Sequence, residues 1–183
     1  MLNQALQFLS EHNEIALATC EGNLPKLRMF QIMKTIEKIS EGQNYTAVNV
    51  GATDEVIQYE LPLGPDMVIP GKVFVGQALG LTGADMSYQT LVPGQDGGFY
   101  HTHKTHEEVY IILKGKGEYQ VDGQNIPIQE GSVIRVAPAG KRTIRNNGSE
   151  NLTMICIQYK AGSFAEGDSP MEDGVILQGP LKW

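Results

Sequence analysis

The pattern of apolar and polar positions at the start of the chain predicts a helix and then a hairpin. Leu2, Ala5, Leu6 and Leu9 recur at helical spacing, so residues 2–11 are expected to form a short amphipathic helix. Two strand-like runs follow, IALATC at 15–20 and LRMFQIM at 27–33, joined by the turn-rich EGNLPK. We expect these first 33 residues to form an appendage that packs on the rest of the protein or on a partner subunit.

From residue 34 the pattern changes to short apolar runs separated by turn residues. The predicted strands are 45–51, 55–64, 72–83, 86–94, FYHTH at 99–103, and then six more runs up to LTMICIQY at 152–159. Many short strands with turn signals such as DG at 122–123 indicate an all-β sandwich or barrel over residues 34–160. The tail, 161–183, is rich in Gly, Pro and acidic residues, and we expect it to wrap the surface with 175–177 and 181–183 as apolar anchors.

Composition narrows the possible partners. The 183 residues are 41% hydrophobic and carry a net charge of −7, without a block of Lys or Arg. This argues against binding to nucleic acid or to an anionic membrane surface. The chain contains neither an apolar run of about 18 residues nor a signal-peptide pattern, so we expect a cytoplasmic protein. Cys20 and Cys156 are isolated in the sequence and are interpreted as thiols, with a disulfide between them left open.

Three of the four histidines gather in one short segment, HTHKTHEE, at 101–108. One residue separates His101 from His103, so in an extended segment their imidazoles share one face. A carboxylate from the next strand, Glu108, would complete a two-His, one-carboxylate set that suits Fe, Mn, Ni, Co or Zn without distinguishing among them. The alternative is an exposed polar turn that happens to hold histidines.

The same segment resembles the first motif of the cupin family, G-x5-H-x-H-x3or4-E-x6-G. The matching residues are Gly94, His101, His103, Glu108 and Gly115, with one extra residue after the first glycine. Glu107 also fits the spacing, but six residues separate Glu108 from Gly115, as the motif requires. The resemblance implies an all-β double-stranded β-helix, a jelly-roll barrel, with a divalent metal in its mouth.

A second cupin motif, G-x5-P-x-G-x2-H-x3-N, is present as Gly131, Pro138, Gly140, Thr143 and Asn147, one residue longer before the proline. Thr143 stands where the family usually has a third histidine, and we expect its side chain to face the metal across a gap filled by water or substrate. His106 is the other candidate for the missing imidazole, and a degenerate pocket without metal is the remaining alternative.

Four further residues are pocket candidates. Tyr110 shares the predicted strand face of Glu108, Gln89 and Gln158 lie on strands expected to flank the site, and Arg142 could bind an anionic substrate. For Tyr110 the alternative is a barrel-lining aromatic, and for Arg142 a surface salt bridge.

Together these features favour a homodimeric, metal-dependent cupin that acts on a small sugar-like or keto acid molecule by oxygenation or isomerisation. The competing hypothesis is a non-catalytic cupin that binds or senses a small ligand. Residues 1–33 also resemble the start of pyridoxamine-phosphate-oxidase-like flavin proteins (LATxxGxxPxxRxF), but too few strands follow for that barrel, so we expect no flavin.

Overall fold

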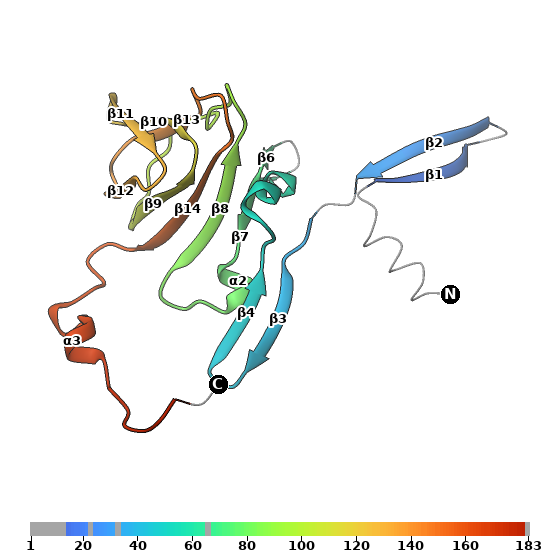
Figure 1. Ribbon diagram of the computed structural model, residues 1–183. Helices are drawn as coiled ribbons and strands as arrows, with labels where there is room; N and C mark the ends of the chain where they lie inside the picture. The colour runs from blue at the N-terminus through green and yellow to red at the C-terminus, as the bar shows by residue number, and fades with distance from the viewer. Residues whose placement is uncertain (1–13, 22–23, 32–33, 65–66, 182–183) are drawn as a thin grey trace.

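The computed structural model describes residues 14–21, 24–31, 34–64 and 67–181. It is built mostly from short strands with a few helices of one or two turns (Figure 1). Within this part of the chain, no helix is long and apolar enough to cross a membrane. The strands are β1 (Glu14–Glu21), β2 (Leu24–Gln31), β3 (Glu37–Gly42), β4 (Tyr45–Asn49), β5 (Glu60–Pro62), β6 (Val68–Pro70), β7 (Lys72–Phe74), β8 (Asp85–Leu91), β9 (His106–Lys114), β10 (Lys116–Val121), β11 (Gln124–Gln129), β12 (Val133–Val136), β13 (Arg142–Arg145) and β14 (Leu152–Lys160). The helices are η1 (Thr53–Gln58), α2 (Gly76–Leu79), η2 (Glu166–Asp168) and α3 (Pro170–Asp173).

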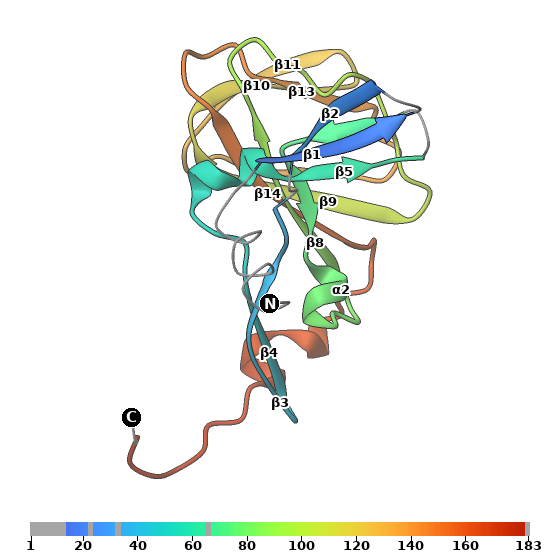
Figure 2. The ribbon, with the colours of Figure 1, turned by 90° about the vertical axis from the view of Figure 1, so that its right-hand side faces the viewer.

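Two antiparallel sheets enclose the core. The larger has the strand order β12-β9-β14-β8-β7, and the smaller has the order β11-β10-β13 (Figures 1 and 2). Strands distant in sequence pair directly, such as β14 with both β8 and β9. This interleaving of early and late strands is what closes a jelly-roll barrel.

Alternation along β9 points its even-numbered side chains inward. Glu108, Tyr110 and Ile112 are buried, in the register that the sequence predicted, while Glu107 forms an ion pair with Arg135 on β12. The core around this face consists of Leu91, Tyr110, Ile112, Tyr119, Ile128, Val136, Ile144, Leu152, Met154 and Cys156.

Three predicted strands differ in the structure. Of the run predicted as a strand over 55–64, only 60–62 form one, β5; its first residues belong to the 3₁₀ helix η1, in which only Val56 is fully buried. The run 72–83 ends as a strand at Phe74 and turns into α2, which stops at Gly80 in the left-handed conformation with φ 68°. FYHTH is an extended segment with only a single bridge, His101 to Arg142.

At the two ends of the chain the outcome is mixed. β1 and β2 pair as an antiparallel hairpin, but the helix expected over 2–11 lies outside the described residues, so the helix-and-hairpin unit stays a prediction. In the tail, the expectation that 175–177 anchor the chain is wrong, because Val175, Ile176 and Leu177 are each more than 80% exposed. Of the other expected anchor, 181–183, Leu181 is also exposed, and residues 182–183 lie outside the described residues.

Candidate metal and ligand site

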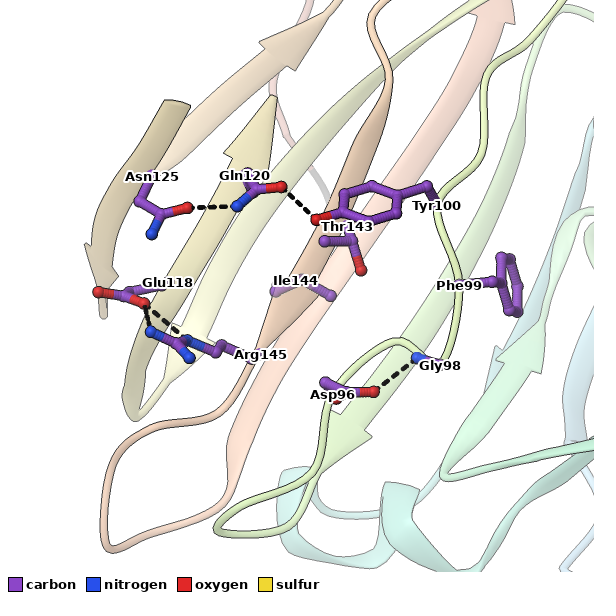
Figure 3. A pocket seen from close by; sticks show the side chains of 10 residues that line it. All are labelled: Asp96, Gly98, Phe99, Tyr100, Glu118, Gln120, Asn125, Thr143, Ile144 and Arg145. Atoms are coloured by element: carbon purple, nitrogen blue, oxygen red, sulfur yellow. Dashed lines mark hydrogen bonds and ion pairs between the residues drawn. The ribbon is translucent and has the colours of Figure 1, made fainter. Parts of the chain in front are cut away.

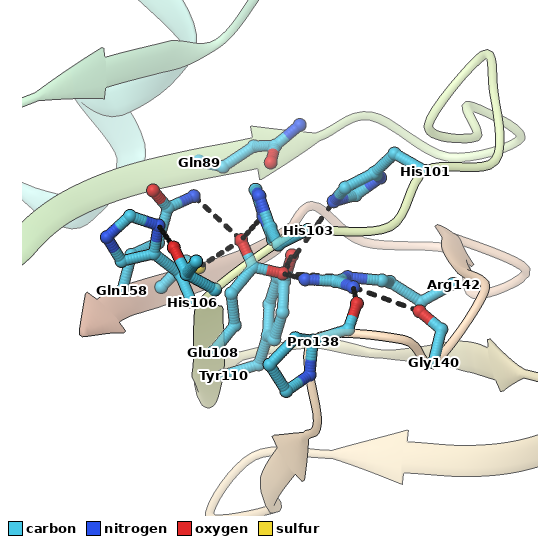
Figure 4. Close-up of polar contacts among 12 residues, drawn as sticks. Gln89, His101, His103, His106, Glu108, Tyr110, Pro138, Gly140, Arg142 and Gln158 are labelled. Atoms are coloured by element: carbon cyan, nitrogen blue, oxygen red, sulfur yellow. Dashed lines mark hydrogen bonds and ion pairs between the residues drawn. The ribbon is translucent and has the colours of Figure 1, made fainter. Parts of the chain in front are cut away.

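The loop after β8 carries both histidines to the open end of the barrel. The backbone of His101 exchanges two hydrogen bonds with Arg142 on β13 (N to O 3.1 Å and 3.0 Å), and the N–H of His103 donates to the carbonyl of Pro138 at 2.9 Å. These bonds hold the segment extended, so both imidazoles point to the same side, toward Glu108 on β9 (Figure 4). The potential ligand atoms of His101, His103 and Glu108 lie within 4.8 Å of one another.

The carboxylate of Glu108 is buried and accepts hydrogen bonds on both oxygens. Its Oε1 accepts from Nε2 of Gln158 at 2.7 Å and from the thiol of Cys156 at 3.5 Å. Its Oε2 accepts from the hydroxyl of Tyr110 at 3.0 Å and from Nε and Nη2 of Arg142 at 2.9 Å and 2.7 Å. Four side chains from three strands, β9, β13 and β14, therefore fix the position of one carboxylate, which leaves it little freedom to rotate.

These contacts also fix its charge. Burial on its own would raise the pKa of Glu108, but hydrogen bonds from His101 and Arg142, the Arg142 charge and the Gln158 amide together hold that pKa well below its ordinary value. These contacts favour the ionised carboxylate form of Glu108.

Arg142, and not Thr143, reaches the cluster, which corrects the sequence alignment. The Arg142 side chain is fully buried; besides Glu108, it donates through Nη1 to the carbonyls of Pro138 at 3.1 Å and Gly140 at 2.9 Å. Counted from Gly131 without an insertion, the second cupin motif places its histidine at 142 and its asparagine at 146. Asn146 is the buried asparagine, donating to the carbonyls of Leu91 and Glu150 at 2.8 Å each. The proline at 138 shifted the sequence-based alignment by one residue.

The residues present fit a divalent metal. Nε2 of His103 is buried and makes no hydrogen bond to any described residue, although it lies 3.1 Å from Oε1 of Glu108. A buried ring nitrogen without a partner is costly, and a metal ion would satisfy it. Because Arg142 balances the charge of Glu108, the cluster as a whole is formally neutral, so it attracts a cation less than a bare carboxylate would.

His106 does not join this cluster. It lies at the start of β9 with its ring centroid 6.3 Å from that of His103, and its Nδ1 is 3.4 Å from the hydroxyl of Thr105. Of the pocket candidates, Tyr110, Gln158 and Arg142 all contact Glu108, so Arg142 forms neither a surface salt bridge nor an open contact for substrate.

Behind the cluster lies a small cavity of about 50 Å³ inside the barrel. Gln89 and Thr143 line it, and so do two residues that the sequence analysis missed, Lys72 and Tyr119. Lys72 pairs with Gln89 in the β7–β8 register, and its ammonium lies 3.3 Å from the Gln89 side-chain oxygen. The sequence does not reveal that Lys72 faces the cavity, because the pairing of β7 with β8 sets which residue of β7 points inward.

A separate groove of about 340 Å³ lies on the outer face of the small sheet (Figure 3). Polar contacts cross part of its wall: the hydroxyl of Tyr100 donates to Gln120 at 2.5 Å, Gln120 donates to Asn125 at 2.6 Å, and Arg145 pairs with Glu118. Thr143 lines this groove as well as the inner cavity.

Comparison with known proteins agrees with this architecture. The sequence profile of a family described as cupin domain matches residues 87–158. The crystal structure of a cupin protein from Bacteroides fragilis is similar, with a TM-score of 0.56 and 38% identity, over 64% of this chain and 100% of that one.

Two curated relatives carry functional names. An oxalate-binding protein from Thermotoga maritima is 31% identical over 67 residues, which are 37% of this chain and 54% of that protein. A glucose-6-phosphate isomerase from Pyrococcus abyssi is 32% identical over 87 residues, 40% of this chain and 46% of that protein. The chain spans about half the length of the curated relatives it matches.

Proposed function

This chain belongs to the cupin superfamily, and we propose that its barrel holds a divalent metal at His101, His103 and Glu108 and acts on a small polar molecule beside it. The observation that carries the proposal is the convergence of two imidazoles on a fixed, ionised carboxylate, with Nε2 of His103 left without a hydrogen bond. The reaction types that fit are oxygenation and isomerisation. When bound, a metal with open positions supplies Lewis-acid activation of an oxygen-containing ligand.

The protein's own side chains have separate tasks in this proposal. Arg142, Gln158 and Tyr110 hold Glu108 in one orientation, so the ligand set is preorganised before any ion arrives. Lys72 lines the adjoining cavity and is the amine placed to exchange a proton with a bound molecule. Burial lowers the pKa of Lys72, although the nearby Cys156 and Glu108 oppose that shift, and a lowered pKa suits a lysine acting as acid or base.

The second candidate function is binding without catalysis. It is favoured by the Arg142–Glu108 ion pair, which balances the cluster internally and lowers its demand for a metal. The name of the Thermotoga maritima relative is consistent with this alternative.

One experiment addresses the metal and the turnover together. Protein purified without added metal is analysed for bound Fe, Mn, Ni, Co and Zn, and the double variant His101→Ala/His103→Ala is analysed beside it. His106→Ala is the matched control, since His106 lies in the same segment but outside the cluster. We expect stoichiometric metal in wild type and control and none in the double variant; equal metal in all three would overturn the site.

The same samples are then incubated with keto acids and sugar phosphates while oxygen uptake and product formation are followed. Turnover that is lost with the metal supports the enzyme. Tight binding of one of these molecules without turnover supports the binding protein instead.

We further propose that the protein is a homodimer. Ile126 on β11 and Val133 on β12 are apolar strand residues with large exposed fractions, 39% and 65%, and a subunit contact would cover them. Light scattering coupled to size-exclusion chromatography tests this, and a monomeric mass at micromolar concentration would refute it.

A further inference from the structure

We propose that Lys72, Gln89 and Tyr119 form an anion subsite inside the barrel that receives a carboxylate group of the ligand, while the other end of that ligand faces His101. The inference rests on the proposed function, because it names the substrate class of the same site. It selects a short carboxylic acid, such as a 2-keto acid or a small dicarboxylate, over a sugar.

The hydroxyl of Tyr119 provides the first argument. Tyr119 is 1% exposed and lines the cavity; its hydroxyl is near enough to Tyr110 for each to affect the other's pKa, but it makes no hydrogen bond of good geometry to any described residue. Leaving a buried hydroxyl without a partner is unfavourable, so such a group in a cavity indicates something that it is meant to contact. Burial raises the pKa of Tyr119, which keeps it a phenol and therefore a hydrogen-bond donor.

Lys72 provides the second argument. Its ammonium lines the same cavity, and Oε1 of Gln89, at 3.3 Å, is the side-chain acceptor that the structure gives it. An ammonium carries three N–H donors, so at least one remains for a ligand. The amide nitrogen of Gln89 adds a further donor at the same wall. The cavity therefore offers three donors, one of them charged, and none of the residues that line it has a carboxylate. This arrangement favours an anionic ligand.

The volume decides which anion. The cavity measures about 50 Å³, and at about 10–15 Å³ per water on this measure it has room for roughly three to four waters, enough for a carboxylate group with a short chain. A pyranose ring is several times larger and does not fit without rearrangement. His101 and Tyr110 line the same space, so a molecule of two to four carbons would extend from Lys72 to the metal cluster.

The test is calorimetric titration of metal-loaded protein with oxalate, pyruvate, acetate and inorganic phosphate. The variants Lys72→Met and Tyr119→Phe remove one donor each and keep side-chain volume. Lys116→Met and Tyr100→Phe are the controls, because both residues are exposed and do not line the cavity. We expect oxalate or pyruvate to bind more tightly than phosphate, with affinity falling about 10- to 100-fold in Lys72→Met and about 10-fold in Tyr119→Phe.

A second readout separates a ligand contact from a structural role. Because the Tyr119 hydroxyl has no partner, Tyr119→Phe should leave the melting temperature of the ligand-free protein unchanged or slightly raised. A lowered melting temperature together with unchanged affinity would overturn the subsite, as would phosphate binding tighter than every carboxylate.

Failure of the metal site gives a different pattern. Carboxylate binding that depends on Lys72 but persists in the metal-free His101→Ala/His103→Ala variant supports the subsite and refutes the metal-dependent function. Metal binding without carboxylate binding supports the metal site and refutes the subsite.

Discussion

Replacing Arg142 by histidine tests how this barrel differs from cupins with three histidines. Arg142 and Glu108 are 0% and 1% exposed and are joined by two hydrogen bonds of 2.9 Å and 2.7 Å. Removing one partner of such a buried pair costs about 3–5 kcal/mol, because the remaining charge stays buried without compensation. A histidine at 142 is also too short to replace the bonds from Arg142 to the carbonyls of Pro138 and Gly140.

The metal-free Arg142→His protein should therefore be less stable than wild type by about 3–5 kcal/mol. At about 2–4 °C per kcal/mol for a chain of this size, its melting temperature should fall by roughly 6–20 °C. The new imidazole also supplies a third nitrogen ligand, and the Glu108 carboxylate is no longer paired with a guanidinium. Metal affinity should rise, and metal at about 1,000 times its dissociation constant should restore about 4 kcal/mol.

The assay is thermal unfolding with excess chelator and again with excess Zn²⁺ or Co²⁺, for wild type and three variants. Arg142→Met removes the charge without supplying a ligand, so it should be destabilised with and without metal. Thr143→His places an imidazole at the residue first aligned with the missing histidine and should not raise metal affinity. If Arg142→His melts like wild type in chelator, or binds metal no more tightly than Arg142→Met, the reasoning about this ion pair is refuted.

Three further outcomes follow from the same contacts. Although burial acts in the opposite direction, hydrogen bonds from His101 and Arg142 hold the pKa of Glu108 below its ordinary value of 4.5. The stability that Glu108 contributes is therefore present above that pH and is lost as the pH falls below it. Urea unfolding from pH 6 to 3 should show a flatter pH dependence in Glu108→Gln, and parallel curves for the two proteins would contradict this. Burial, followed by the charge of Glu108, raises the pKa of Cys156 to about 12, so in a Cys20→Ser background its thiol should react with iodoacetamide at pH 8 only on unfolding, and rapid labelling of the native protein would contradict this. Asn146→Ala leaves two carbonyls without their donor and should cost about 2–4 kcal/mol in urea unfolding, whereas a loss under 1 kcal/mol would mean that water replaces the amide.

The parts of the site that could be predicted from sequence are those set by spacing within one segment. His101, His103 and Glu108 lie within eight residues, and the alternation of extended backbone is enough to aim them together. The sequence alignment places Thr143 opposite the metal ligands, whereas Arg142 is the residue that reaches Glu108. Two anchors, Gly131 and Pro138, give registers that differ by one residue, and one residue reverses which side chain points inward.

Other features depend on contacts between distant segments. Lys72 faces the cavity only because β7 pairs with β8 in a particular register, which no local pattern encodes. Likewise the sequence predicts a strand over 55–64, but the structure forms the 3₁₀ helix η1 over 53–58, in which only Val56 is buried, and limits the strand to β5.

The contacts of Glu108 also have a consequence for the order in which the chain folds. Its partners Arg142 and Gln158 lie 34 and 50 residues further along the chain, so they reach it only after β13 and β14 have docked. Closing such long loops is slow, and non-local contacts tend to form late. Partly folded chains would thus carry the ligand residues without the clamp on the carboxylate. We expect the capacity to hold a metal to appear in the last stage of folding, which makes metal uptake during refolding a direct signal of barrel closure.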